Sequence, residues 1–267
     1  MSQEAFIDLQ NISVTYRSRT LAPVSALENF NLTVKEGEFL TIIGPSGCGK
    51  STLLHILAGL QRPTQGEVLI EGERIETPRP DKVAMVFQEY TLFPWRTVLG
   101  NVEVGLEFKG ISKQERREKA LEKIKLVGLQ GFETRYPHEL SGGMKQRVAI
   151  ARALTIDPEI LLMDEPFGAL DEQTRLVLGE ELMRIWEETR KTIIFVTHSL
   201  SEAVYLSDRI VVMTARPGRI KEVLKVDFPH PRGPEIMTTD AFEDLRIQLL
   251  RNLYEESKKA VLQENKA

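Results

Sequence analysis

"FLTIIGPSGCGKSTLLHILAGL" (residues 39–60) is an apolar run, a glycine-rich turn and a second apolar run with helical spacing. The turn fits the pattern G-x-x-x-x-G-K-[ST], in which successive backbone N–H groups point inward at a phosphate. Glycine is needed in such a turn where a side chain would collide. The helix that follows adds the partial positive charge of its N-terminus. This stretch therefore predicts a strand, a phosphate-binding loop and a helix.

Within the loop, Lys50 is expected to neutralise the β- and γ-phosphate oxygens of ATP, and the Ser51 hydroxyl is expected to bind Mg²⁺. Cys48 is interpreted as a small residue that fits the turn, and as the single cysteine it excludes an internal disulfide and suits a reducing compartment. The residues predicted to contact the nucleotide here are Gly44, Pro45, Ser46, Gly47, Cys48, Gly49, Lys50, Ser51 and Thr52.

Further apolar runs predict strands at Val83–Phe87, Ile160–Met163, Ile193–Val196 and Ile210–Met213. They are continuous rather than alternating, which is typical of a parallel sheet covered on both faces. The first 35 residues and residues 66–75 alternate and carry turn residues, which favours an antiparallel layer. The predicted fold class is α/β, doubly wound, with a mostly parallel core sheet and an N-terminal antiparallel β layer.

Residues 98–156 read as mostly helical, with Ser112 and Glu115 forming a capping box at one helix start. Because this block lies between two core strands, we expect a helical subdomain inserted into the sheet domain. The predicted organisation is one ATPase domain over residues 1–220. A short tail, 221–267, is proline-rich at first and then forms an amphipathic helix.

Composition narrows the class of protein. Apolar residues at 42% and charged residues at 28% are an ordinary globular balance, and no apolar run approaches a membrane span. The start "MSQEAF" lacks a basic-then-apolar signal peptide, so a soluble cytoplasmic chain is expected. The net charge of −4 argues against a nucleic-acid partner.

Polar side chains follow three of the predicted strands. Asp164 and Glu165 end the strand "ILLM", Gln88 follows "VAMVF", and His198 follows "TIIFVT". In parallel sheets ligands bind at the carboxyl ends of the strands. Asp164 is therefore predicted to hold Mg²⁺, Glu165 to polarise the attacking water, and His198 to contact the γ-phosphate. Gln88 is predicted either to bind the metal or to order that water.

A second glycine-rich turn, "LSGGM", begins another helical pattern. A site that already has a phosphate-binding loop needs no second one. Ser141, Gly142 and Gly143 are therefore expected to serve the nucleotide of a second copy of the domain. Two copies related head to tail by a two-fold axis would enclose two ATP molecules.

These motifs together, the P-loop, Gln88, "LSGGMKQR", "ILLMDEP", "GALD" and His198 in this order, resemble the nucleotide-binding subunit of an ABC transporter. The resemblance covers roughly residues 5–220. It implies a P-loop NTPase fold and ATP hydrolysis coupled to transmembrane transport. It also implies that Tyr16 stacks on adenine and that Asp171 belongs to the loop coupling the two sites of the dimer.

The resemblance further implies partners and a location. The region after Gln88, with Tyr90, Phe93 and Trp95, would form the groove that receives a helix of a transmembrane permease. The chain would lie peripherally on the cytoplasmic face of the inner membrane, with a second ATPase subunit, identical or related. "LFPWRTVLGNV" and "TARPGRI" are similar to importers of nitrate, sulfonates and taurine, which need an extracytoplasmic solute-binding protein.

Other functions share parts of this pattern. An exporter or lipid-transport ATPase would carry every catalytic motif and differ in its partner. A chromosome-maintenance ATPase would insert a long coiled coil before "LSGGM", and no extended heptad run is present here. A translation-associated relative would carry two cassettes, and a P-loop kinase would have no use for "LSGGM".

Overall fold

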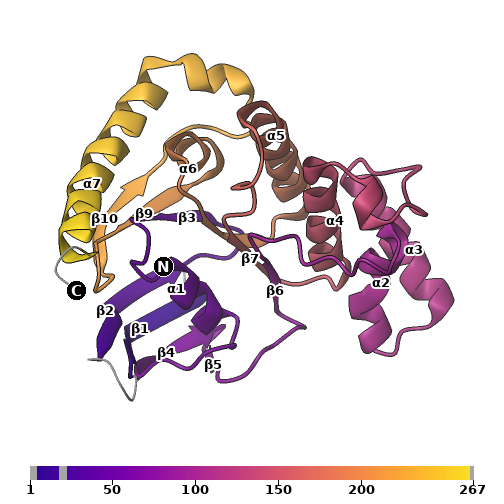
Figure 1. Cartoon of the computed structure of the whole chain (residues 1–267), viewed down its shortest axis with the longest axis horizontal. Helices are drawn as coiled ribbons and strands as arrows, with labels where there is room; N and C mark the ends of the chain where they lie inside the picture. Colours follow the sequence, from indigo (N-terminus) through magenta and orange to yellow (C-terminus); the bar gives the residue numbers. More distant parts are fainter. Residues whose placement is uncertain (1–4, 18–22, 265–267) are drawn as a thin grey trace. The chain divides into compact units, whose positions relative to one another are not determined.

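The computed structural model describes residues 5–17 and 23–264. They form two compact units (Figure 1). The first unit lies within residues 1–79 and 192–267, and the second unit is Pro80–Lys191.

An antiparallel sheet forms one part of the first unit. Its strands are β1 (Ile7–Tyr16), β2 (Val24–Val34), β4 (Gln65–Ile70) and β5 (Glu73–Arg74), in the order β2-β1-β4-β5. Along β1 buried and more exposed side chains alternate, as expected when one face packs on a core. The predicted antiparallel layer is confirmed.

Parallel strands form the second part of the first unit. β3 (Phe39–Ile43) pairs in parallel with β8 (Thr192–Val196) on one side and with β9 (Arg209–Met213) on the other. β10 (Ile220–Lys225) adds to β9 in antiparallel orientation. Every residue of β3 and β8 is buried, which explains why their sequences are continuously apolar.

In the described part of the first unit, the α-helices are α1 (Lys50–Leu57), α6 (Leu200–Leu206) and α7 (Asp240–Glu264), and a short 3-10 helix, η2 (Pro234–Thr238), precedes α7. The chain leaves β3, makes the glycine turn and enters α1 directly. Helix α7 packs against α6 and β9, and its Phe242 and Leu249 are buried. In the described part of the chain, no helix combines the length and the apolar character needed to cross a membrane.

The second unit contains two strands and four α-helices. β6 (Val83–Val86) and β7 (Ile160–Asp164) pair in parallel. Helices α2, α3 and α4 pack on one another, and Ser112 caps α3 by accepting a hydrogen bond from the Glu115 N–H at 3.3 Å. The helices are α2 (Val98–Phe108), α3 (Lys113–Leu126), α4 (Gly142–Thr155) and α5 (Glu172–Thr189). With these elements the predicted α/β class, including its helical insertion, is confirmed.

The ring pair between β3 and β8 offers a test of this core. Phe39 and Phe195 are fully buried, with ring centroids 5.9 Å apart. Replacing Phe195 by Ala removes this packing and leaves a cavity, so we expect a loss of roughly 3–5 kcal/mol in the free energy of unfolding. Urea denaturation would measure it. Phe108→Ala, at a side chain 78% exposed, is the control and should change stability by less than about 0.5 kcal/mol. Equal effects of the two variants would contradict the assigned core.

Candidate functional site

The turn between β3 and α1 is packed too tightly for side chains. A Cβ atom on Gly44 would lie 2.8 Å from the Cys48 sulfur and 3.0 Å from the Met213 Cβ. Gly49 has a φ of 106°, where residues with a Cβ are strained, and its Cβ would lie 2.7 Å from Leu27 Cδ2. Both glycines of the predicted motif are therefore required by the shape of the turn.

Lys50 places a buried positive charge inside this turn. Its ammonium donates hydrogen bonds to the carbonyl oxygens of Gly44, at 2.9 Å, and Pro45, at 3.2 Å. Within residues 5–17 and 23–264, no carboxylate pairs with it. A buried ammonium that meets only neutral oxygens is left without an opposing charge. The turn therefore suits an anion such as a phosphate group.

The neighbouring loop residues differ in exposure. Ser46 and Ser51 are exposed, so the Ser51 hydroxyl at the first turn of α1 is available as a hard oxygen ligand. Cys48 is fully buried. Burial raises the pKa of its thiol, and the nearby positive charges of Lys50 and Arg216 offset this only partly. The thiol is therefore protonated at neutral pH, in agreement with its interpretation as a packing residue.

Tyr16 lies beside the start of α1. Its hydroxyl is 3.1 Å from the Thr52 hydroxyl and donates to the Gln61 side chain at 3.1 Å. The residue is 47% exposed, which leaves part of the ring open to a ligand. The structure therefore brings Tyr16 together with the last residue of the predicted loop.

His198 lies in the turn between β8 and α6, in the same unit. Thr197 donates a hydrogen bond to Glu202 and accepts one from the Ser199 N–H at 3.0 Å. The Ser199 side chain in turn caps α6. His198 is an exposed side chain on this braced turn.

In the second unit, the side chains of Gln88 and Glu165 both lie near Gly168. A Cβ on Gly168 would lie 3.7 Å from the Gln88 amide nitrogen and 3.8 Å from the Glu165 Cβ. Asp164 is the last residue of β7, and Glu165 follows it with a φ of 46°, an uncommon value for a residue with a Cβ. Strained backbone of this kind clusters at functional sites. The carboxylate of Asp164 and the amide oxygen of Gln88 are donors of the type that Mg²⁺ prefers.

The second glycine-rich turn begins α4. The Ser141 side chain caps the helix by accepting a hydrogen bond from the Met144 N–H at 3.3 Å. A Cβ on Gly142 would lie 3.1 Å from the Tyr90 hydroxyl, and one on Gly143 would lie 3.0 Å from Thr174 Cγ2. Ser141 itself is exposed, so its hydroxyl lies at the surface at the N-terminus of α4, whereas Gly143 is buried.

Asp171 has a local role that the sequence analysis did not foresee. It is the N-cap of α5 and accepts hydrogen bonds from the Thr174 N–H, at 2.9 Å, and from the Thr174 hydroxyl, at 2.7 Å. These bonds, the N–H first, hold the pKa of this carboxyl below its ordinary value. The carboxylate is exposed and stays charged at neutral pH.

Two arginines were missed by the sequence analysis. Arg152 of α4 donates to the carbonyls of Tyr90, at 3.1 Å, and Thr91, at 2.7 Å, and so holds the segment that follows Gln88. Arg216 donates to the Gly47 carbonyl from Nε, at 3.2 Å, and from Nη2, at 3.1 Å. Neither set of contacts has a signature in the local sequence, because the partners are distant along the chain.

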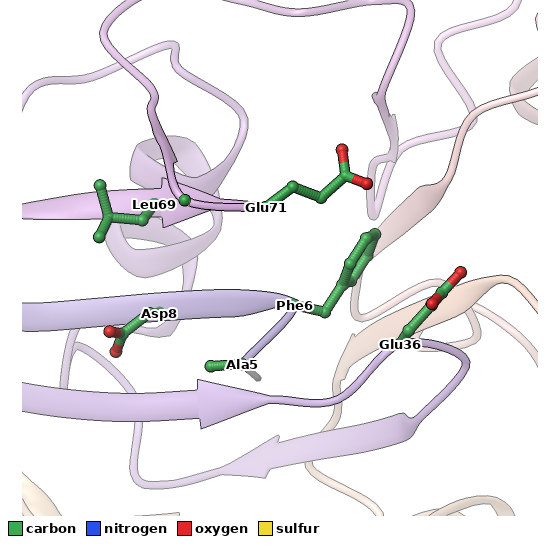
Figure 2. A pocket seen from close by; sticks show the side chains of 7 residues that line it. Ala5, Phe6, Asp8, Glu36, Leu69 and Glu71 are labelled. Carbon is green, nitrogen blue, oxygen red and sulfur yellow. The ribbon is translucent and has the colours of Figure 1, made fainter. Parts of the chain in front are cut away.

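A cavity of about 460 Å³ lies elsewhere in the first unit (Figure 2). Figure 2 shows the Phe6 ring pointing toward the space flanked by Glu36 and Glu71. Among its described lining residues, none belongs to the predicted nucleotide site. It is lined by Ala5, Phe6, Asp8, Glu36, Leu69, Glu71 and Gly72.

Known proteins are similar to this chain in sequence over most of its length. Residues 27–168 match the family described as ABC transporter. An uncharacterised ABC transporter ATP-binding protein of Methanocaldococcus jannaschii is 59% identical over 89% of this chain and 88% of its own. The aliphatic sulfonates import ATP-binding protein SsuB of Bacillus cereus is 50% identical over 88% of this chain and 91% of its own.

Solved structures agree with the sequence relatives. One is the dimeric structure of a post-hydrolysis state of an ATP-binding cassette bound to ADP and Pi, whose sequence is 40% identical to this chain. It has a TM-score of 0.74 and covers 84% of this chain and 100% of the solved one. A dimeric bacterial ABC transporter cassette matches with the same figures. The chain therefore belongs to the ABC transporter family, as an ATPase subunit that binds ATP with Mg²⁺.

Proposed function

We propose that this ATPase powers the import of a small solute of the sulfonate, taurine or nitrate type. The observation that carries the proposal is the 50% identity to the SsuB protein of Bacillus cereus, whose name assigns it to import of aliphatic sulfonates. The segments "LFPWRTVLGNV" and "TARPGRI" support the same solute class by their resemblance to that group of importers.

The proposed chemistry assigns each residue one task. Lys50 and the glycine turn bind the phosphates, because the buried ammonium has no opposing charge among the described residues. In the first unit Ser51 would offer its hydroxyl to Mg²⁺, and in the second unit Asp164 and Gln88 would offer side-chain oxygens; the metal supplies charge neutralisation at the phosphates when bound. Glu165 would take the proton of the attacking water, and His198 would donate a hydrogen bond to the γ-phosphate.

We further propose that two copies associate head to tail, so that Ser141, Gly142 and Gly143 of one copy face the ATP of the other. The exposed Ser141 at the start of α4 supports this, since a hydroxyl at a helix N-terminus is suited to contact an anion. The matched cassette structures are described as dimers. Binding of ATP would then favour the closed pair over separate copies.

The surface proposed for the permease follows Gln88. Trp95 is 72% exposed, although its ring lies 5.5 Å from that of Phe93, between centroids. The Arg96 guanidinium covers the Phe93 ring at 5.8 Å. An exposed tryptophan on an ordered aromatic pair is the kind of anchor that protein interfaces use.

The test of import is purification of the tagged chain from its native membranes, with identification of every protein that copurifies. A polytopic membrane protein with an extracytoplasmic solute-binding protein is expected. That binding protein should then bind sulfonates, taurine or nitrate in titrations. A membrane partner without a binding protein would replace import by export or lipid transport, and soluble partners alone would remove the transport function.

Glu165→Gln tests the proposed base. The variant should bind ATP normally, hydrolyse it at least about 100-fold more slowly, and accumulate as a dimer in ATP, because binding is kept while proton transfer is lost. Phosphate release and size-exclusion chromatography measure both effects. Glu159→Gln, at an exposed glutamate before the start of β7, is the matched control and should behave as wild type. Near-normal turnover of Glu165→Gln would remove Glu165 from this role.

Ser141→Asp tests the second anion site. Asp caps helices as well as Ser, so α4 should remain intact, while a negative charge would now face the phosphate of the other copy. We expect ATP-dependent dimerisation and hydrolysis to fall at least about tenfold, with unchanged ATP binding by the monomer. Ser112→Asp, the same substitution at the N-cap of α3, is the control. Loss of monomer binding would show that Ser141 serves its own chain's nucleotide instead.

Cys48 provides a chemical test of the loop. Because the thiol is buried and its pKa is raised, alkylation by iodoacetamide at pH 7.5 should be at least about tenfold slower than for free cysteine. MgATP should slow it further, and the alkylated protein should no longer bind nucleotide. Mass spectrometry follows the modification. Full ATP binding by the alkylated chain would contradict the assignment of this turn.

A further inference from the structure

The turn formed by residues 214–218, between β9 and β10, packs directly on the phosphate-binding turn. The Arg216 guanidinium donates twice to the Gly47 carbonyl, at 3.2 and 3.1 Å. A Cβ on Gly218 would lie 2.0 Å from the Cys48 carbonyl oxygen, so the two backbones touch at a position where only glycine fits. The Gly218 N–H also donates to the Ala26 carbonyl at 2.8 Å, which fixes the turn to β2.

Helix α7 holds the same turn from its other side. Glu256 is 1% exposed and accepts a hydrogen bond from the Ala215 N–H at 2.9 Å. Near the end of the helix, the Gln263 side-chain amide donates to the Arg216 carbonyl at 2.9 Å. Ala215 and Arg216, which are adjacent in the turn, therefore each form a backbone hydrogen bond with a side chain of α7.

The buried Glu256 is a strong anchor because its charge is compensated. Its carboxylate pairs with Lys259 at 2.7 Å and with Lys221 of β10 at 3.2 Å. A shift of α7 would separate the buried Glu256 carboxylate from these lysines, which costs free energy because the charge would be buried without a partner. The position of α7 against the turn is therefore closely defined.

We propose that α7 sets the nucleotide affinity of the phosphate-binding turn by way of residues 214–218, with Arg216 and Gln263 as positioning residues. The inference rests on the proposed binding of nucleotide by this turn. The Gly47 carbonyl and the Cys48 N–H belong to the same planar peptide group and point in opposite directions. By binding the carbonyl, Arg216 therefore also fixes the direction of the Cys48 N–H. That N–H reaches the Pro45 carbonyl only at 3.4 Å, a weak bond that a phosphate oxygen could replace at little cost.

Equilibrium titration of the full chain with MgADP tests Arg216 without contributions from dimerisation. Arg216 is exposed, and Arg216→Ala should leave the thermal unfolding temperature unchanged. Its Kd should rise roughly three- to tenfold, the range expected for losing the hydrogen bonds that hold one peptide group. Arg216→Lys, which keeps a donor and the charge, should recover part of the loss. Arg219→Ala removes an exposed arginine of the same segment, paired with Glu28 at 2.7 Å, and is the control expected to bind as wild type.

Gln263 tests the part played by α7. Gln263→Ala should weaken MgADP binding roughly two- to threefold, since one hydrogen bond to the turn is lost. Gln248→Ala, which removes a bond at 3.1 Å to Glu222 from the same helix, is the matched control. If Gln263 acts through Arg216, the double variant Arg216→Ala with Gln263→Ala should bind no more weakly than Arg216→Ala alone.

The outcomes separate the inference from the function on which it rests. If the wild-type chain binds no MgADP, the proposed nucleotide site itself fails. If wild type binds and Arg216→Ala binds equally well, Arg216 has no positioning role. If the losses from the two substitutions add fully, α7 does not act through Arg216, and the proposed link is wrong.

Discussion

The close packing of the glycine turn between β3 and α1 is the constraint on which the rest of the first unit depends. Gly44 meets the Cys48 sulfur, Gly49 meets Leu27, and Gly218 meets the Cys48 carbonyl, in each case at a distance that excludes a Cβ. The turn is therefore shaped by β2, by the segment after β9 and by itself. A loop held in this way has lost its conformational freedom before any ligand arrives, which lowers the entropic cost of binding.

Glu256 and Lys50 are buried charged residues of this unit with opposite kinds of surroundings. The Glu256 carboxylate meets two lysines and a backbone N–H, while the Lys50 ammonium meets two neutral carbonyls. Burial of a charge is costly unless it is paired, so the compensated glutamate fits a structural role. Lys50 has no carboxylate partner among the residues that the structure describes, and it keeps its attraction for an anion that binds there.

The strands could be predicted because their signals are local. Continuous apolar runs identified β3 and β8 nearly to the residue, and the end of β6 was misplaced only by Phe87, which is 36% exposed. The nucleotide assignments that rest on loop chemistry remain predictions. The contacts of Arg152 and Arg216 could not be foreseen, because an arginine that donates to distant carbonyls has the same local sequence as one in solvent. The capping of α5 by Asp171 was foreseeable from the residues beside it, but the family resemblance drew attention to another role.

Helix α4 holds the segment after Gln88 at two places. The Tyr90 hydroxyl rests against the first turn of the helix at Gly142, and Arg152 binds the carbonyls of Tyr90 and Thr91 from a later turn. Two attachments restrict the movement of the segment relative to the helix more than one would. In a head-to-tail pair, a displacement of α4 imposed by the other copy's nucleotide would therefore pull on the residues beside Gln88.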